Sequence, residues 1–113
     1  MIGLKISGTT KFKGVEIVAP LPNVKIKKLT GTTGATEGDT TDIAHGLTLS
    51  KIIGLNVLVT ATNGNLIPPS FVRVFEFQYD VFIDPTNIKV ILSIANSGSI
   101  LNSAITVLLT HEE

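Results

Sequence analysis

Only two side chains, His45 and His111, could serve as imidazole bases near neutral pH, and the sequence has no cysteine. The lack of cysteine excludes a thiolate nucleophile, a disulfide framework and a cysteine-based zinc site. Neither histidine stands beside a nucleophile in a recognisable arrangement. Residues 96–99, Asn-Ser-Gly-Ser, are typical of a turn and not of a Gly-x-Ser-x-Gly motif. No catalytic residue is predicted, and the sequence favours a structural or binding module over an enzyme.

Paired aspartates are the second group with possible chemistry. Asp39 with Asp42 in a loop, or Asp80 with Asp84 near a strand end, could give oxygen ligands to a calcium ion. Carboxylates at surface turns are far commoner than such sites, so no metal is predicted. The glycine-rich segment 31–39 fits neither the dinucleotide-binding fingerprint nor a phosphate loop, and no cofactor is predicted.

His45, which precedes Gly46, has two interpretations. A histidine at such a position is usually a turn residue with its ring satisfied locally. In a trimer, one histidine per chain near the three-fold axis would instead bind an ion or hold water. The sequence leaves both interpretations open.

The elements that position these side chains are expected to be strands. Isoleucine, threonine and valine make up 38 of the 113 residues, and β-branched side chains suit pleated sheet. Apolar and polar residues alternate over several segments that are separated by turn residues. The predicted strands are 2–7, 15–17, 24–29, 53–61, 71–83, 88–94 and 105–109, with turns at 63–65, 84–87 and 96–99. The expected fold class is all-β, an antiparallel β-sandwich of jelly-roll-like type.

Four of the six aromatic residues, Phe71, Phe75, Phe77 and Tyr79, lie at odd positions of the segment 71–83. In a strand these side chains share one face, so they are expected to form core.

The net charge of zero hides an asymmetry. Residues 1–30 hold six lysines and one glutamate, a charge of +5, whereas residues 31–113 hold three basic and eight acidic residues, a charge of −5. We therefore predict a basic N-terminal arm over residues 1–35 and a head domain over residues 36–113, joined by a loop or hinge at 31–39. Such an arm could meet an acidic partner, although lysines on strands more often simply face water. Nucleic acid is not predicted as a partner, because arginine is almost absent and one aromatic residue lies among these lysines.

Apolar content is higher than one small core needs, with 43% hydrophobic residues and a mean hydropathy of +0.42. No apolar run approaches the roughly 20 residues of a spanning helix, and the N-terminus lacks the pattern of a secretion signal. We expect a soluble protein made in the cytoplasm, without membrane insertion, whose surplus apolar surface faces another subunit.

One stretch resembles a known family. Residues 41–47 read Thr-Asp-Ile-Ala-His-Gly-Leu, and Lys-Ile-Ile-Gly-Leu follows at 51–55. An Ile-Pro-Pro step at 67–69, a Ser-Gly-Ser-Ile loop at 97–100 and a closing Ile-Thr-Val-Leu-Leu-Thr at 105–110 come later in the chain. In this order residues 36–113 resemble the head or tip domains of bacteriophage fibre and receptor-binding proteins.

The resemblance implies a homotrimeric structural protein of the virion, a fibre head or a capsid decoration, that contacts other virion proteins through its arm. Contact with a host-surface glycan or receptor is implied as well. Such proteins usually place a long shaft before the head, whereas only about 35 residues precede the matching part here. This difference favours a small virion component over a complete adhesin.

Two other function classes stay open. A carbohydrate- or receptor-binding module would use the loops 31–42, 61–70 and 96–102, although the absence of Trp and the expected burial of Phe and Tyr count against a stacking platform for sugars. An enzyme with an inter-subunit site is the third reading. The candidate surface-loop contacts are Asp39, Asp42, Asn63, Asn65, Asn96, Ser97 and Ser99.

Overall fold

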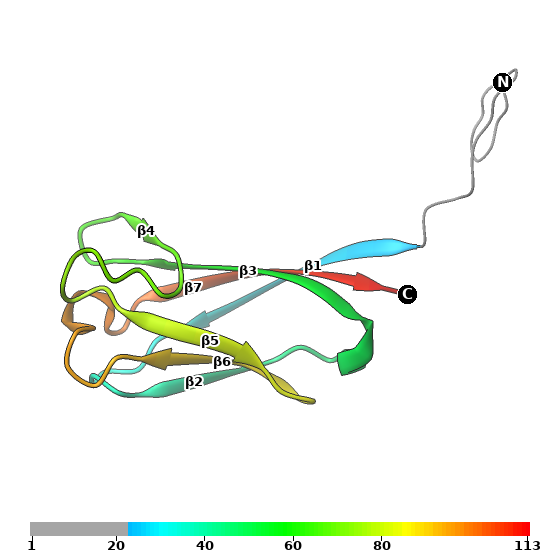
Figure 1. The fold of residues 1–113 in the computed structure, drawn as a ribbon, viewed down its shortest axis with the longest axis horizontal. Coiled ribbons are helices and arrows are strands. Elements are labelled where there is room, and N and C mark those ends of the chain that lie inside the picture. The colour runs from blue at the N-terminus through cyan, green and yellow to red at the C-terminus, as the bar shows by residue number, and fades with distance from the viewer. Residues whose placement is uncertain (1–22) are drawn as a thin grey trace, which may run out of the picture.

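The protein is an all-β sandwich of two antiparallel sheets in a computed structural model that describes residues 23–113 (Figure 1). The first sheet has the order β1-β7-β3-β4, with bounds Val24–Thr32, Ala104–Glu112, Ile52–Thr60 and Leu66–Ile67. The second sheet has the order β2-β6-β5, with bounds Thr40–Ala44, Asn87–Leu92 and Tyr79–Ile83. Two 3₁₀ turns, η1 (Leu49–Lys51) and η2 (Gly98–Ile100), complete the described elements. The predicted all-β antiparallel sandwich is confirmed.

The core lies between the two sheets and follows the period of two in the sequence. On β7, Ile105, Val107 and Leu109 are buried, and on β6 every second residue from Ile88 to Leu92 is buried. Directly opposite residues in neighbouring antiparallel strands share a face of the sheet. Alternation along each strand therefore produces one continuous apolar layer, completed by Ile43, Val57, Val59, Ala61, Ile67, Tyr79 and Ile100.

The N-terminal side of the predicted domain boundary needs correction. β1 pairs with β7 over its whole length, from Val24 opposite Glu112 to Thr32 opposite Ala104. Residues 24–32 therefore belong to the sandwich and not to a separate arm. Residues 1–22, with the two strands predicted there, lie outside the described residues.

The segment predicted as an exposed hinge, 31–39, is anchored to the sandwich instead. Thr33 is buried, and its hydroxyl donates to the carbonyl oxygen of Ile100 at 2.6 Å and accepts the backbone N–H of Ser103 at 2.7 Å. Gly31 allows close packing of β1 on β2, because a Cβ there would lie 2.8 Å from Cδ1 of Ile43, which would have to shift. The three glycines had indicated a loop, but one of them serves sheet packing.

The long aromatic strand predicted over 71–83 is wrong. Only Tyr79–Ile83 form a strand, and the preceding residues form a loop in which Ser70 and Glu76 have positive φ angles of 60° and 78°. Left-handed backbone interrupts strand geometry. The spacing of aromatic residues by two in this segment does not place them on one face, and Phe75 is 73% exposed.

Two smaller departures come from β3 and β2. A register shift between Ile52 and Gly54 interrupts the pairing of β3 with β7, so Ile52 packs against the core while Ile53 is 54% exposed. A bulge inserts one residue and moves the side chains before it to the other face. The predicted face 53–61 is therefore correct only after the bulge. β2 was not predicted, because residues 31–42 were interpreted as a polar loop.

Both predicted hairpin turns are present. At residues 84–87 the Asp84 carboxylate accepts the backbone N–H groups of Thr86 at 2.8 Å and Asn87 at 2.6 Å. At residues 63–65 the Asn63 side chain accepts the N–H of Asn65 at 3.0 Å, and Gly64 has a φ of +89°. Side chains that bind the backbone two or three residues later are what make Asp and Asn frequent in turns.

Tyr79 links the two sheets through its hydroxyl. It lies on β5 in the second sheet, is 1% exposed, and donates to the carbonyl oxygen of Ile67 on β4 in the first sheet at 2.6 Å. Burial raises the pKa of the Tyr79 hydroxyl well above its usual range, so the group remains a donor at any ordinary pH.

We expect Tyr79→Phe to lower the free energy of unfolding by about 1–2 kcal/mol, because the Ile67 carbonyl loses its buried donor while the ring still fills the core. Urea denaturation followed by circular dichroism measures this. Phe82→Tyr, on the exposed side of the same strand, is the matched control and should change stability by less than about 0.5 kcal/mol. Equal stability of Tyr79→Phe and the parent would show that the hydroxyl does not tie the sheets together.

Candidate functional site

The two ends of the sandwich differ in what they carry. At one end, here called the termini end, β1 begins and β7 finishes, and the N–H of Glu113 donates to the carbonyl oxygen of Asn23 at 3.0 Å (Figure 1). At the opposite end, the loop end, the connections between strands gather, namely residues 33–39, 61–65, 68–78 and 93–103. Loops held by a rigid scaffold are where binding residues concentrate. A binding site is therefore expected at the loop end.

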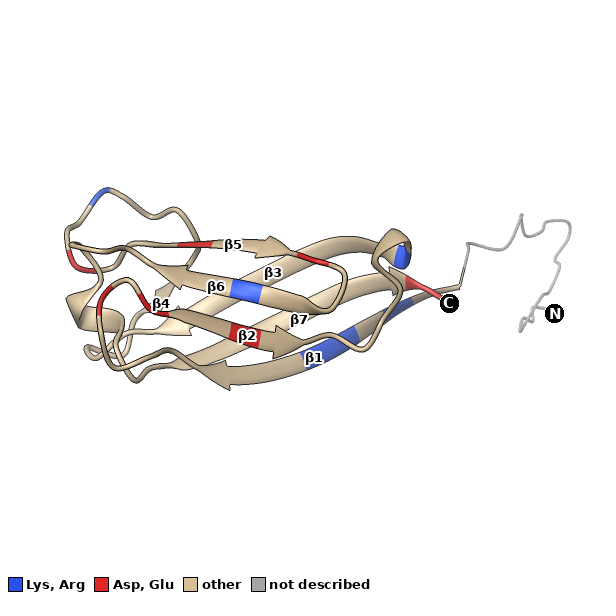
Figure 2. Ribbon diagram, turned by 90° about the horizontal axis from the view of Figure 1, so that it is seen from below, with Lys and Arg blue, Asp and Glu red and all other residues tan. Residues whose placement is uncertain are grey.

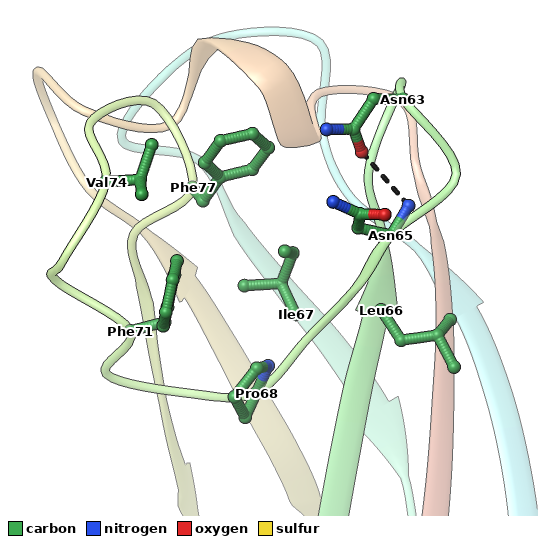
Figure 3. A pocket seen from close by; sticks show the side chains of 8 residues that line it. All are labelled: Asn63, Asn65, Leu66, Ile67, Pro68, Phe71, Val74 and Phe77. Atoms are coloured by element: carbon green, nitrogen blue, oxygen red, sulfur yellow. Dashed lines mark hydrogen bonds between the residues drawn. The ribbon is translucent and has the colours of Figure 1, made fainter.

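A pocket of about 490 Å³ opens at the loop end (Figure 3). One wall is the hairpin turn that carries Asn63 and Asn65, and the other is the loop that carries Phe71, Val74 and Phe77. Its lining residues are Asn63, Asn65, Leu66, Ile67, Pro68, Phe71, Val74 and Phe77. A volume of this size falls within the roughly 300–1,000 Å³ range of small-molecule sites, which are also mostly apolar with a few polar groups.

The hairpin wall is held by its own hydrogen bonds. The N–H of Ala61 donates to the carbonyl oxygen of Asn65 at 2.8 Å, and Asn63 accepts the N–H of Asn65 at 3.0 Å. These bonds leave the Asn65 side chain exposed above Ile67, which is 6% exposed and contributes to the pocket wall nearest the core. The turn that the sequence predicts at 63–65 therefore also places the side-chain amides of Asn63 and Asn65 at the pocket.

The opposite wall is pinned at both ends. The N–H of Ser70 donates to the carbonyl oxygen of Tyr79 at 2.7 Å, and the Ser70 hydroxyl donates to Asp80 at 2.8 Å. Near its other end, the Glu76 carboxylate accepts the N–H of Gly98 at 2.9 Å. Phe71 and Phe77 are partly buried against the core between these points, so the loop holds their rings beside the pocket.

Two of the sequence-predicted contacts, Asn63 and Asn65, come together in this pocket. The sequence did not identify their neighbours Phe71 and Phe77, because their spacing had placed both rings in a core strand. The two prolines at 68 and 69 indicated a new segment, but because proline is compatible with the start of a strand they did not exclude one here.

The other predicted contacts do not join them. Ser97 is fully buried, and its hydroxyl donates to the carbonyl oxygen of Ser93 at 2.6 Å, which corrects its assignment as a surface contact. Asp42 lies in strand β2 and not in a loop, where it pairs with Lys89 at 3.1 Å. Asp39, Asn96 and Ser99 are partly exposed loop-end residues that bind neighbouring backbone.

His45 has a structural environment at the termini end of the second sheet. It is 1% exposed, its Nδ1 accepts the N–H of Leu47 at 3.0 Å, and its Nε2 lies 2.9 Å from the carbonyl oxygen of Asp84. Because Nδ1 accepts, Nε2 carries the proton and donates. With both ring nitrogens used inside the chain, neither is left for an ion on a symmetry axis, and the turn interpretation accounts for the contacts of the ring.

The backbone of His45 joins three elements. Its N–H donates to the carbonyl oxygen of Thr86 at 3.1 Å, and its carbonyl oxygen accepts from Lys27 Nζ on β1 at 2.7 Å. The neighbouring Asp84 carboxyl has a lowered pKa, chiefly because the N–H groups of Asn87 and Thr86 donate to its charged form. The charged carboxylate therefore supports the turn against which His45 is held.

Of the aspartates that could have bound calcium, Asp39 and Asp84 accept backbone N–H groups, Asp42 pairs with Lys89, and Asp80 accepts from the Ser70 hydroxyl. Within residues 23–113, no three His, Asp or Glu side chains gather in a way that could hold a metal ion. Nor is any helical turn in this part of the chain long and apolar enough to cross a membrane.

The outward faces of the two sheets differ in character. Three rows across β1, β7 and β3 on the first sheet are Ile26-Thr110-Gly54, Lys28-Leu108-Asn56 and Thr30-Thr106-Leu58. Lys28 has the single charge in these rows, and a groove of about 420 Å³ near them includes Leu58, Pro69 and Leu108 in its lining. On the second sheet, Asp42, Lys89 and Phe82 form one outward row. Figure 2 shows an acidic position on β2 beside a basic position on β6.

Comparison with known proteins gives no match, whether to protein-family models, to curated proteins or to solved structures. The interpretation of the pocket and of the sheet faces therefore depends on their geometry and on the residues themselves.

We expect His45→Ala to lower the free energy of unfolding by about 2–4 kcal/mol, because it leaves a cavity and removes the partners of two backbone groups. Thermal and urea unfolding measure this, with His111→Ala, near the end of β7, as a control expected to have a small effect. Dialysis of the parent protein against EDTA should leave its unfolding curve unchanged. A loss of stability on chelation would return His45 to the role of an ion ligand.

Proposed function

We propose that this chain is a structural protein of a virion: a homotrimeric fibre-head or capsid-decoration module that is mounted by its N-terminal side and turns its loop end outward. The observation that carries the proposal is the placement of the two ends. β1 begins at the termini end (Figure 1), and the pocket lies among the connections at the opposite, loop end (Figure 3). This arrangement suits a domain that is held from one side and makes contacts on the other.

The outward face of the first sheet supports assembly into an oligomer. Ile26 is 71% exposed, and Leu58, Leu66 and Leu108 are exposed on the same sheet. They lie among Lys28, Asn56 and threonines on this face, and exposed apolar side chains rimmed by polar residues are typical of an interaction surface. If copies of the chain packed on this face, its exposed apolar side chains would be removed from water. The outward face of the second sheet, which carries Asp42 and Lys89, would stay solvated.

The choice of a virion over other assemblies rests on the resemblance of residues 36–113 to phage fibre and receptor-binding heads. The sandwich fold is compatible with that resemblance. Residues 1–22 hold three lysines and one glutamate and are the proposed attachment to an acidic surface of another virion protein.

A carbohydrate- or receptor-binding module is the second candidate function, and one observation favours it. The phenylalanines that were expected in the core lie in the loop 68–78 beside two exposed amides. The third reading, an enzyme with an inter-subunit site, has no observation in its favour among the described residues.

We expect light scattering at micromolar concentration to give a mass about three times that of the 12.0 kDa chain. Leu108→Glu should convert this species to monomer, because it places a carboxylate at the centre of the apolar face. Phe82→Glu, on the outward face of the second sheet, is the matched control and should remain trimeric. A parent protein that is monomeric at this concentration would overturn the trimer.

The virion assignment is tested by where the protein and its gene are found. We expect capsid, portal or tail genes beside this gene, and we expect peptides of the chain in purified particles by mass spectrometry. A gene set among metabolic enzymes of a cellular genome, with the protein absent from particles, would contradict the assignment even if the trimer were found.

A further inference from the structure

We propose that the loop-end pocket binds an uncharged pyranose ring, such as the terminal sugar of a surface glycan. The inference deepens the proposed function, since it needs the loop end to face outward, but the binding itself can be measured on the protein alone. It rests on three properties of the pocket, namely its lack of charge, its pair of amides and its aromatic wall.

The absence of charge from the lining limits the ligand to neutral molecules. None of the eight residues that line the pocket carries a charged side chain. A carboxylate or phosphate entering the pocket would lose hydration without gaining a counter-charge, which is costly. Sialic and uronic acids are therefore poor ligands, and neutral sugars are favoured.

The two amides on the hairpin wall match sugar hydroxyls. An asparagine side chain offers both donors and an acceptor, as a hydroxyl group does. The Asn63 oxygen already accepts the N–H of Asn65, so its NH₂ group remains as a donor, and the Asn65 side-chain amide has no hydrogen-bond partner within the described chain. Figure 3 shows these side chains on the opposite side of the pocket from the phenylalanines.

The aromatic wall matches the C–H faces of a pyranose. Phe71 and Phe77 are partly buried against the core, so their rings form a wall with little conformational entropy left to lose on binding. Ile67 and Pro68 continue the apolar surface below them. A ring with apolar faces and a hydroxylated edge can contact both walls at once.

The rival occupants match the pocket less well. A purely apolar molecule would cover the two amides without satisfying them, at a cost for each unpaired group. A peptide strand is not favoured, because the turn 61–65 has already paired the Ala61 N–H and the Asn65 carbonyl oxygen within the hairpin. A neutral sugar uses both the amides and the rings.

The test is a titration of the full-length, isotope-labelled chain with methyl glycosides of glucose, galactose, mannose, rhamnose and N-acetylglucosamine, followed by NMR. At least one glycoside should cause saturable shifts in the side-chain NH₂ signals of Asn63 and Asn65 and in the methyl signals of Ile67 and Val74. Glucuronic acid should bind at least tenfold more weakly than the best neutral sugar.

Asn65→Ala should weaken that binding at least tenfold, and Phe77→Leu, which keeps an apolar side chain at the wall, should weaken it as well. Asn96→Ala, at the loop end but outside the pocket, is the matched control and should bind as the parent does. If all five glycosides leave the spectra unchanged, if Asn65→Ala binds as the parent does, or if glucuronic acid binds as tightly as the best neutral sugar, the inference is overturned. A monomeric protein that binds sugar would overturn the trimer and leave the pocket assignment in place.

Discussion

The packing of two separately hydrogen-bonded sheets against each other is the constraint on which the rest of the structure depends. No ladder joins the first sheet to the second. They are held by the apolar layer between them and by polar ties, two of which run from Lys27 to the His45 carbonyl and from Tyr79 to the Ile67 carbonyl. Each tie satisfies a buried polar group, so it also fixes how the sheets are aligned.

These ties also affect which groups at the two ends of the sandwich are available to a ligand. The His45 tie lies at the termini end, where it leaves no polar group of the ring free for a ligand. The Tyr79 tie lies under the loop end and holds β4 at Ile67, which lines the pocket. The strand residues of the pocket lining, Leu66 and Ile67, are therefore held in place, and the loop residues of the lining follow from them in the chain.

The parts of the fold that sequence could predict are those that depend on local chemistry. Alternation from residue 105 to 109 and the turns at 63–65 and 84–87 each follow from a few neighbouring residues, and all were predicted correctly. The bulge at Ile53 and the burial of Thr33 depend on partners distant in the chain, so no local pattern indicates them. The loop 68–78 was missed because its aromatic spacing imitates a strand, while its shape depends on positive φ at two residues that are not glycine.

The position of the phenylalanines in the loop 68–78 matters for function. With these phenylalanines in a core strand, the loops would offer no aromatic surface, whereas in the loop 68–78 they line a pocket together with Asn63 and Asn65, which were predicted as surface-loop contacts. The apolar surplus of the sequence is thus divided between two exposed places. A broad face on the first sheet suits contact with large, flat partners such as other copies of the chain, and a concave pocket at the loop end suits a small ligand. Because these places lie on different surfaces of the sandwich, assembly through one leaves the other open.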